Sequence, residues 1–286
     1  LRQMSGLKVL SLGGLTTAAL LFAVAWSLPD GRLHVTFVDV GDGAATLIET
    51  PSGRKVLVDA GGSGRRLSTA LGRALPYWDQ RIDLLVITQL TPTHIAALPA
   101  ITARYRFDAV IVNPQPGEPE VEASLEDLLL KRGTQRIAAQ PGMSVRVGDG
   151  VELTVLRAQD ASPMPVKGAD SPVVLILAYK DVRILLAGDM TPEDEAALLN
   201  GYHPLYAAVL QVPRGGHRDL SSEAFLAAVS PQAAVISVGE TNRSGLPHPE
   251  ALERLRAAGT TVYRTDRDGT VWMISDGRRV WIRTER

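Results

Sequence analysis

Short apolar runs separated by glycine- and proline-containing turns make up most of the chain after residue 32. Residues 33–39, 45–49 and 55–59 are rich in strand-forming residues, and turns at 41–43 and 51–53 separate them. Such runs predict short strands joined as antiparallel neighbours. The same criteria predict further strands at residues 84–88, 109–113, 142–147, 151–157, 172–179, 182–187, 207–212, 233–238, 261–263, 269–275 and 279–283.

Apolar residues at helical spacing lie between these strands. They predict helices at residues 66–75, 94–104, 122–132, 192–199, 221–229 and 249–258. Two halves that each mix strands and helices favour two sheets packed face to face, with the helices outside. With 286 residues, 45% of them hydrophobic, the chain is long enough to bury such a core.

An uncharged segment precedes this pattern. Residues 9–28 (VLSLGGLTTAALLFAVAWSL) carry no charge and match the length of a helix that crosses a bilayer. Arg2 and Lys8 lie before the segment and predict that this end stays in the cytoplasm. A cleaved signal peptide, with a small-x-small site at residues 23–25, is the alternative. We expect a transmembrane helix or signal segment with its linker at residues 1–32, and a folded domain at 33–286 that is membrane-anchored on the extracytoplasmic side.

Composition narrows the chemistry that this domain can perform. The absence of cysteine excludes disulfides, thiolate nucleophiles and cysteine-ligated zinc, so a metal would need His, Asp and Glu ligands. A formal net charge of −1 means that polyanion binding would depend on local patches. Arginines are frequent near the C-terminus, and we expect them to be solvated strand and turn residues: Arg264, Arg267, Arg278, Arg279, Arg283 and Arg286.

Residues 84–98 (LLVITQLTPTHIAAL) hold the most informative motif. An apolar strand runs into a polar loop at residues 88–93, and a helix opens at His94. This layout resembles the signature loop of the metallo-β-lactamase superfamily, in which a strand ends in Thr-His-x-His-x-Asp-His and a helix follows. The resemblance implies an αββα sandwich.

Further motifs extend this resemblance to the C-terminal domain of the ComEC/Rec2 family of DNA-uptake (competence) proteins. They cover the soluble part from His34 to about Arg283 and are residues 39–45 (DVGDGAA), 56–62 (VLVDAGG), 185–189 (LLAGD), 210–217 (LQVPRGGH), 242–249 (NRSGLPHP) and 265–269 (TDRDG). The family belongs to a DNA-uptake channel and is implied to cut the non-transported strand outside the membrane.

The resemblance also identifies which metal ligands this chain has replaced. A two-metal hydrolase needs imidazoles and carboxylates at fixed offsets to hold a bridging hydroxide. The replaced positions are Gln89, Thr91, Thr93, Arg214, Gly215 and Leu246. The retained residues are His94, Asp189 and His248, and His217 stands where the family has a serine.

Two interpretations of the site follow. Loss of the first metal's ligands and of the carboxylate of the second predicts a pseudoenzyme without a cofactor, in which Arg214 could pair with Asp189 or contact a phosphate. The alternative is a hydrolase with Asp189 and His94 as catalytic residues, holding one zinc or manganese ion with His248 and His217.

Three functions are consistent with these interpretations. The first is a DNA-uptake domain of a membrane protein whose nuclease activity is lost or reduced, attached to the rest of a polytopic channel protein upstream. The second is an active metal-dependent phosphodiesterase or nuclease. The third is a non-catalytic domain that binds single-stranded or duplex DNA electrostatically.

Overall fold

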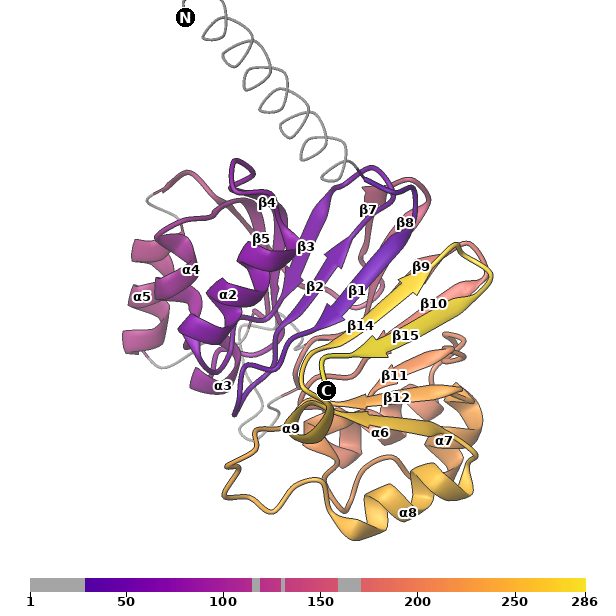
Figure 1. Cartoon of the computed structure of the whole chain (residues 1–286). Helices are drawn as coiled ribbons and strands as arrows, with labels where there is room; N and C mark the ends of the chain where they lie inside the picture. Colours follow the sequence, from indigo (N-terminus) through magenta and orange to yellow (C-terminus); the bar gives the residue numbers. More distant parts are fainter. Residues whose placement is uncertain (1–28, 115–118, 130–131, 159–170) are drawn as a thin grey trace, which may run out of the picture. The chain divides into compact units, whose positions relative to one another are not determined.

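The computed structural model describes residues 29–114, 119–129, 132–158 and 171–286 (Figure 1). Residues from Gly31 to Arg286 form one compact unit. The predicted membrane-spanning segment at residues 9–28 lies outside the described residues. Among the residues that are described, no helix combines the length and the apolar character needed to cross a membrane.

The first sheet contains eight strands among the described residues, in the order β15-β14-β1-β2-β3-β4-β5-β6. Its members are β1 (Leu33–Phe37), β2 (Thr46–Glu49), β3 (Lys55–Val58), β4 (Arg81–Ile87), β5 (Arg106–Val112), β6 (Gln135–Ala138), β14 (Val271–Ser275) and β15 (Val280–Thr284). The pairs from β15 to β3 are antiparallel, and those from β3 to β6 are parallel. The last two strands of the chain therefore return to pair beside the first.

The second sheet contains seven strands within the described ranges, in the order β13-β12-β11-β10-β9-β8-β7. Its members are β7 (Ser144–Gly148), β8 (Val151–Arg157), β9 (Val174–Tyr179), β10 (Val182–Leu186), β11 (Val209–Gln211), β12 (Ala233–Ile236) and β13 (Thr261–Arg264). Strands β10 to β13 pair in parallel, and every residue of β11 and β12 is buried. Parallel strands covered on both faces are commonly apolar throughout, and Gln211 at the end of β11 is the exception in these two strands.

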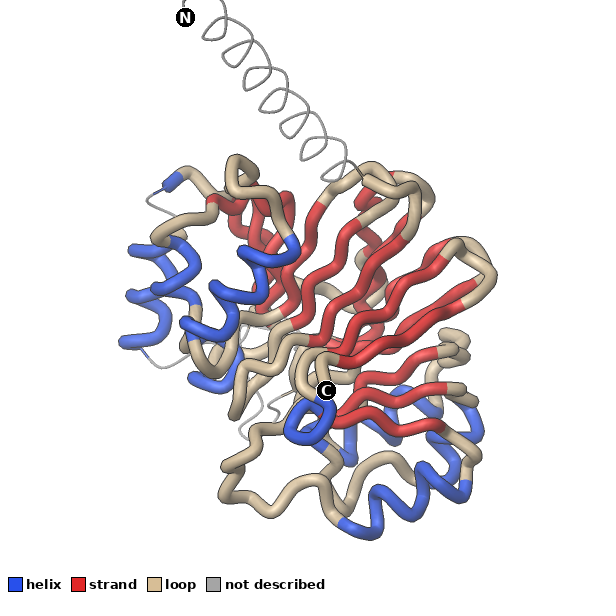
Figure 2. The backbone as a smooth tube through the Cα atoms, in the orientation of Figure 1, coloured by secondary structure: helices blue, strands red, loops and turns tan. Residues whose placement is uncertain are grey.

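The two sheets pack face to face, and helices lie on the outside (Figure 2). The core between the sheets draws on both of them, with Val35, Phe37 and Val86 from one and Leu175 and Ile184 from the other. Outside the first sheet lie α2 (Gly64–Ala74), α3 (Pro92–Ile95), α4 (Leu98–Thr102) and α5 (Pro119–Leu128), and outside the second lie α6 (Pro192–Leu199), α7 (Glu223–Val229) and α8 (Pro249–Ala257). The short helices η2 (Pro213–Gly215) and α9 (Thr265–Asp268) follow β11 and β13. This is the expected αββα sandwich.

Two local expectations were wrong. The single helix expected at residues 94–104 is divided into α3 and α4 because Pro99 has no N–H to continue the helix, and the Ala97 N–H donates to the Ala60 carbonyl instead. Strand β6 was not expected, because its sequence lacks a strand-like apolar pattern. In the structure its residues Gln135 and Arg136 are exposed.

Candidate functional site

A cavity of about 630 Å³ lies at the edge where several strands of both sheets end. Loops that follow β1, β4, β10, β11 and β12 line it. Its ionisable lining residues are Asp42, His94, Asp189, Arg214, His217 and Arg243. The cavity therefore joins side chains that are distant in sequence.

His94 is a buried residue that lines this cavity, and two threonine hydroxyls contact its ring. The residue is 2% exposed, and its Nδ1 atom is 2.7 Å from Thr91 Oγ1 and 3.1 Å from Thr93 Oγ1. The two threonine hydroxyls are also 2.9 Å from each other. On the other side of the ring, Nε2 is 3.8 Å from Asp189 Oδ2. His94 and Asp189, predicted as a catalytic pair, are thus brought together.

Asp59 lies behind this pair and was not predicted as a site residue. Its carboxylate accepts hydrogen bonds from the backbone N–H and the hydroxyl of Thr88, both at 2.8 Å. Burial raises the pKa of Asp59 to about 6, while His94 and the Thr88 hydrogen bonds oppose the rise. Its backbone is left-handed, with φ of 60°. The only sequence signal was the position of Asp59 between an apolar strand and two glycines.

Close backbone approach explains two glycines of the first motifs. A Cβ atom on Gly61 would lie 1.7 Å from the Thr93 carbonyl oxygen, and one on Gly43 would lie 2.5 Å from the same atom. The Ala44 N–H donates to this carbonyl at 3.3 Å. A side chain at either glycine would therefore push away the loop that carries His94.

The other predicted ligands are not gathered around His94. His217 lines the cavity, but its Nδ1 atom lies 3.6 Å from Asp219 Oδ2. His248 is the N-cap of α8, does not line the cavity, and contacts the Glu250 carboxylate through Nδ1. The three histidines therefore contact three different carboxylates, and only His94 lies beside Asp189.

Four of the six positions that the resemblance predicts as replaced ligands line the cavity. Thr93, Arg214, Gly215 and Leu246 line the cavity, whereas Gln89 and Thr91 do not. Arg214 has a left-handed backbone with φ of 48°, and its N–H donates to the Gly188 carbonyl at 2.9 Å. The suggested Arg214–Asp189 ion pair is not present among the described residues, where Asp189 Oδ2 instead lies 3.8 Å from His94 Nε2.

The donor groups around His94 differ from those of the two-metal centre that the resemblance implies. Among the described residues, no three His, Asp or Glu side chains are grouped so that they could hold a metal ion. The His94 Nδ1 atom already contacts two hydroxyls, and only Nε2 and Asp189 face each other. Zinc sites take three or four protein ligands, so these donors do not fit a two-metal centre.

The cavity instead offers unpaired positive charge at its rim. Arg214 and Arg243 are exposed, and neither forms an ion pair with any residue that the structure describes. A guanidinium group binds carboxylates and phosphates through its planar set of N–H donors. The cavity can therefore bind an anionic group without a metal.

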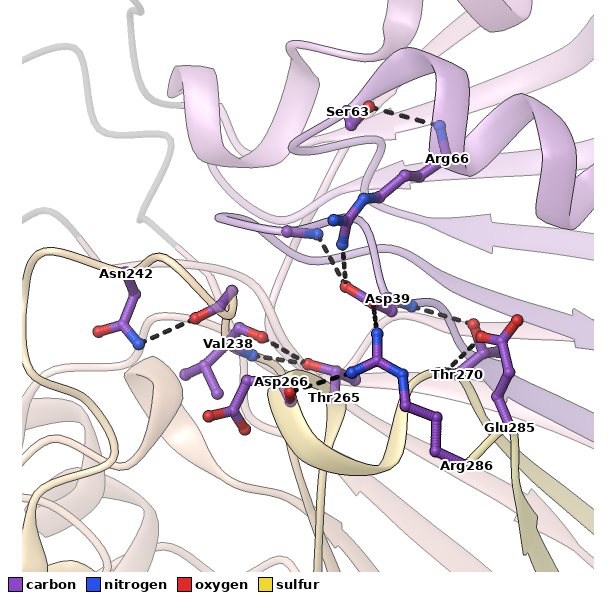
Figure 3. A network of polar contacts seen from close by, with 12 residues as sticks. Asp39, Ser63, Arg66, Val238, Asn242, Thr265, Asp266, Thr270, Glu285 and Arg286 are labelled. Carbon is purple, nitrogen blue, oxygen red and sulfur yellow. Dashed lines mark hydrogen bonds and ion pairs between the residues drawn. The ribbon is translucent and has the colours of Figure 1, made fainter.

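A polar network connects the loop after β1, which carries Asp42, to the C-terminal end of the chain (Figure 3). Asp39 accepts hydrogen bonds from Arg66 at 2.7 Å and from the Gly41 N–H at 3.1 Å, and it lies 3.6 Å from Arg286. Its own N–H donates to Thr270 Oγ1 at 3.3 Å. Since Asp42 follows Asp39 by three residues, this network positions the cavity wall.

Known proteins resemble this chain in sequence and in fold. The sequence profile of the Metallo-beta-lactamase superfamily matches residues 38–240. ComE operon protein 3 of Bacillus subtilis is 24% identical over 94% of this chain, and competence protein ComA of Neisseria gonorrhoeae is 27% identical over 86%. The chain spans 36% of the length of the first and 33% of the second.

A solved structure gives the same fold. The metallo-beta-lactamase fold protein YhfI of Bacillus subtilis superposes with a TM-score of 0.55 at 12% identity, covering 87% of this chain and 99% of that protein. The family profile covers well over half of the 286 residues, and the two-sheet architecture agrees with it. The chain belongs to the metallo-β-lactamase superfamily.

Proposed function

We propose that this domain serves DNA uptake as the extracytoplasmic part of a membrane protein, and that its cavity holds a DNA strand without cutting it. The similarity to two proteins of bacterial competence over most of the chain supports the uptake role. The uncharged segment at residues 9–28 supports the membrane anchor. The chain spans about a third of these relatives, and in our proposal a segment upstream of it, equivalent to the rest of their length, forms the channel.

The residues that stand at the ligand positions carry this proposal. Thr91 and Thr93 replace two ligands, and their hydroxyls contact the Nδ1 atom of the retained His94. Arg214 replaces another and adds an unpaired positive charge to the cavity wall. Without a second group of ligands, no bridging hydroxide would be held for attack on a phosphodiester. An arginine there would instead contact the phosphate of a bound strand.

A binding and cleavage assay on the full chain in detergent tests both parts. A fluorescein-labelled oligothymidine should bind with an affinity that falls as salt increases, because phosphate binding releases counterions. Arg214→Gln should weaken binding about fivefold and reduce the salt slope by about 0.7, the loss of one phosphate contact. Arg218→Gln is the matched control, since Arg218 is exposed nearby but does not line the cavity.

The cleavage arm decides between a binding domain and a single-metal hydrolase. We expect the labelled strand to keep its length when manganese or zinc is added to the wild-type chain. Shortening of the strand that Asp189→Ala abolishes would establish the hydrolase and refute the non-cutting role. Equal binding by the Arg214 and Arg218 variants would refute cavity binding.

A further inference from the structure

The outward face of β14 and β15 carries two tryptophans that no described helix covers. Val271 and Met273 belong to the core between the sheets, and Val280 and Ile282 pack against that core. Since side chains alternate along a strand, the residues between them face outward, namely Trp272, Ile274, Trp281 and Arg283. Figure 1 shows α2, α4 and α5 over the neighbouring part of this sheet, and β14 and β15 without a helix in front of them.

Arginine side chains stack on both tryptophan rings. The Arg283 guanidinium lies 4.9 Å from the centroid of Trp272, and that of Arg32 lies 5.5 Å from the centroid of Trp281. Trp281 remains 43% exposed. In the register of the two strands, Trp272 faces Arg283 and Trp281 faces Ile274, so the tryptophans are diagonal neighbours about 7–8 Å apart at their backbones.

This face also concentrates positive charge in a chain whose formal net charge is −1. Arg278 and Arg279 lie at the adjacent turn, and both are exposed, as is Arg283. None of these three arginines pairs with a carboxylate in the described part of the chain. Asp276 at the same turn accepts hydrogen bonds from the backbone N–H groups of Arg278 and Arg279 rather than from a guanidinium. The surface therefore complements a polyanion.

We infer that this face, defined by Trp272, Trp281, Arg32 and Arg283, binds single-stranded nucleic acid by stacking bases on the tryptophans. Aromatic rings on an open sheet, with arginines beside them for the phosphates, are what sequence-tolerant single-strand binders use. Bases in a duplex are stacked on one another and do not offer their faces to a protein ring. The inference rests on the proposed DNA-uptake function and adds a contact outside the cavity.

Oligothymidine and an abasic strand of equal length separate this face from the cavity. Both probes carry phosphates, but only oligothymidine carries bases to stack. With the full chain in detergent, Trp281→Leu should weaken oligothymidine binding about tenfold and leave binding of the abasic strand unchanged. Trp281→Phe should keep most of the affinity because the smaller ring still stacks. Trp78→Leu is the matched control, since Trp78 is 62% exposed on the loop between α2 and β4.

Each outcome decides the inference. If Trp281→Leu binds oligothymidine as the wild type does, the stacking face is refuted. Weaker binding of both oligothymidine and the abasic strand by Arg214→Gln would in that case still support DNA binding in the cavity. Equal weakening by Trp281→Leu and Trp78→Leu would also refute the stacking face. Trp281→Leu should melt within a few degrees of the wild type. If it does not, the wild-type chain is used instead, and oligothymidine is expected to quench its tryptophan fluorescence. Absence of quenching then counts against the face.

Discussion

Asp59→Asn should remove a pH-dependent loss of stability that the buried carboxylate imposes. Asp59 is 3% exposed, and burial raises its pKa from 3.8 to about 6. A rise of that size corresponds to about 3 kcal/mol of folding free energy. Asparagine suits the site, because it tolerates the left-handed backbone with φ of 60° and can bond to Thr88 through its oxygen and its amide group.

The direction of the pH dependence follows from whether the folded or the unfolded state holds the proton of Asp59. Between pH 3.8 and about 6 the folded state holds the proton on Asp59 and the unfolded state has released it. Stability from this group is therefore highest below pH 3.8, falls as pH rises through this window, and stays low above pH 6. Asparagine does not titrate, so the variant should gain on the wild type by about 3 kcal/mol from acid to neutral pH.

Urea unfolding of the segment of residues 31–286, followed by tryptophan fluorescence at constant ionic strength, measures this difference. The unfolding free energies of variant and wild type are subtracted at each pH from about 4 to 8, because other carboxylates titrate in both proteins and cancel. Asp181→Asn is the control, since it removes the same group from an exposed position. A difference for Asp59→Asn that is constant across this range would refute the reasoning.

Two further predictions concern packing and a buried charge. Gly61→Ala should destabilise the fold by roughly 3 kcal/mol because the new Cβ would lie 1.7 Å from the Thr93 carbonyl, whereas Gly72→Ala should stabilise α2 by roughly 0.5–1 kcal/mol; thermal melting of both variants checks this. Asp194 is fully buried and accepts a hydrogen bond from Arg157 Nε at 2.9 Å, so Asp194→Ala should cost roughly 3–5 kcal/mol in urea unfolding and Asp194→Asn clearly less. Similar melting of the two glycine variants, or the same urea unfolding free energy for Asp194→Ala and the wild type, would contradict these arguments.

The sequence was sufficient for the layer architecture because strand and helix patterns are local. The turns at 41–43 and 51–53 predicted the antiparallel order of β1, β2 and β3, which the structure has. Pairing of β14 with β1 was not predicted, because it joins residues more than 200 positions apart and no local pattern records such a partner. Of the stacking face, Arg32, which precedes β1, depends on this pairing, whereas the two tryptophans lie on the β14–β15 pair.

The site was predictable only where a known motif named a residue. His94 and Asp189 converge because each follows a strand that ends at the same edge, β4 in one sheet and β10 in the other. Asp59 was missed because its importance comes from burial beside His94, which a sequence does not display. Arg214 lines the cavity, and of the two roles suggested for it, pairing with Asp189 is absent among the described residues while contact with a phosphate stays a prediction.

The retained His94 has a structural role that does not depend on a metal. Its carbonyl accepts the Ala60 N–H at 2.7 Å, which ties the loop after β4 to the loop after β3. A buried imidazole also needs hydrogen-bond partners, and the hydroxyl of Thr91 supplies one at 2.7 Å from Nδ1. Thr91 stands at one of the positions that the resemblance predicts as replaced ligands, and its hydroxyl gives His94 a partner that requires no metal ion. These contacts hold the loop around His94 without a metal ion, so the presence of His94 does not require metal chemistry, and the cleavage assay with Asp189→Ala tests for it directly.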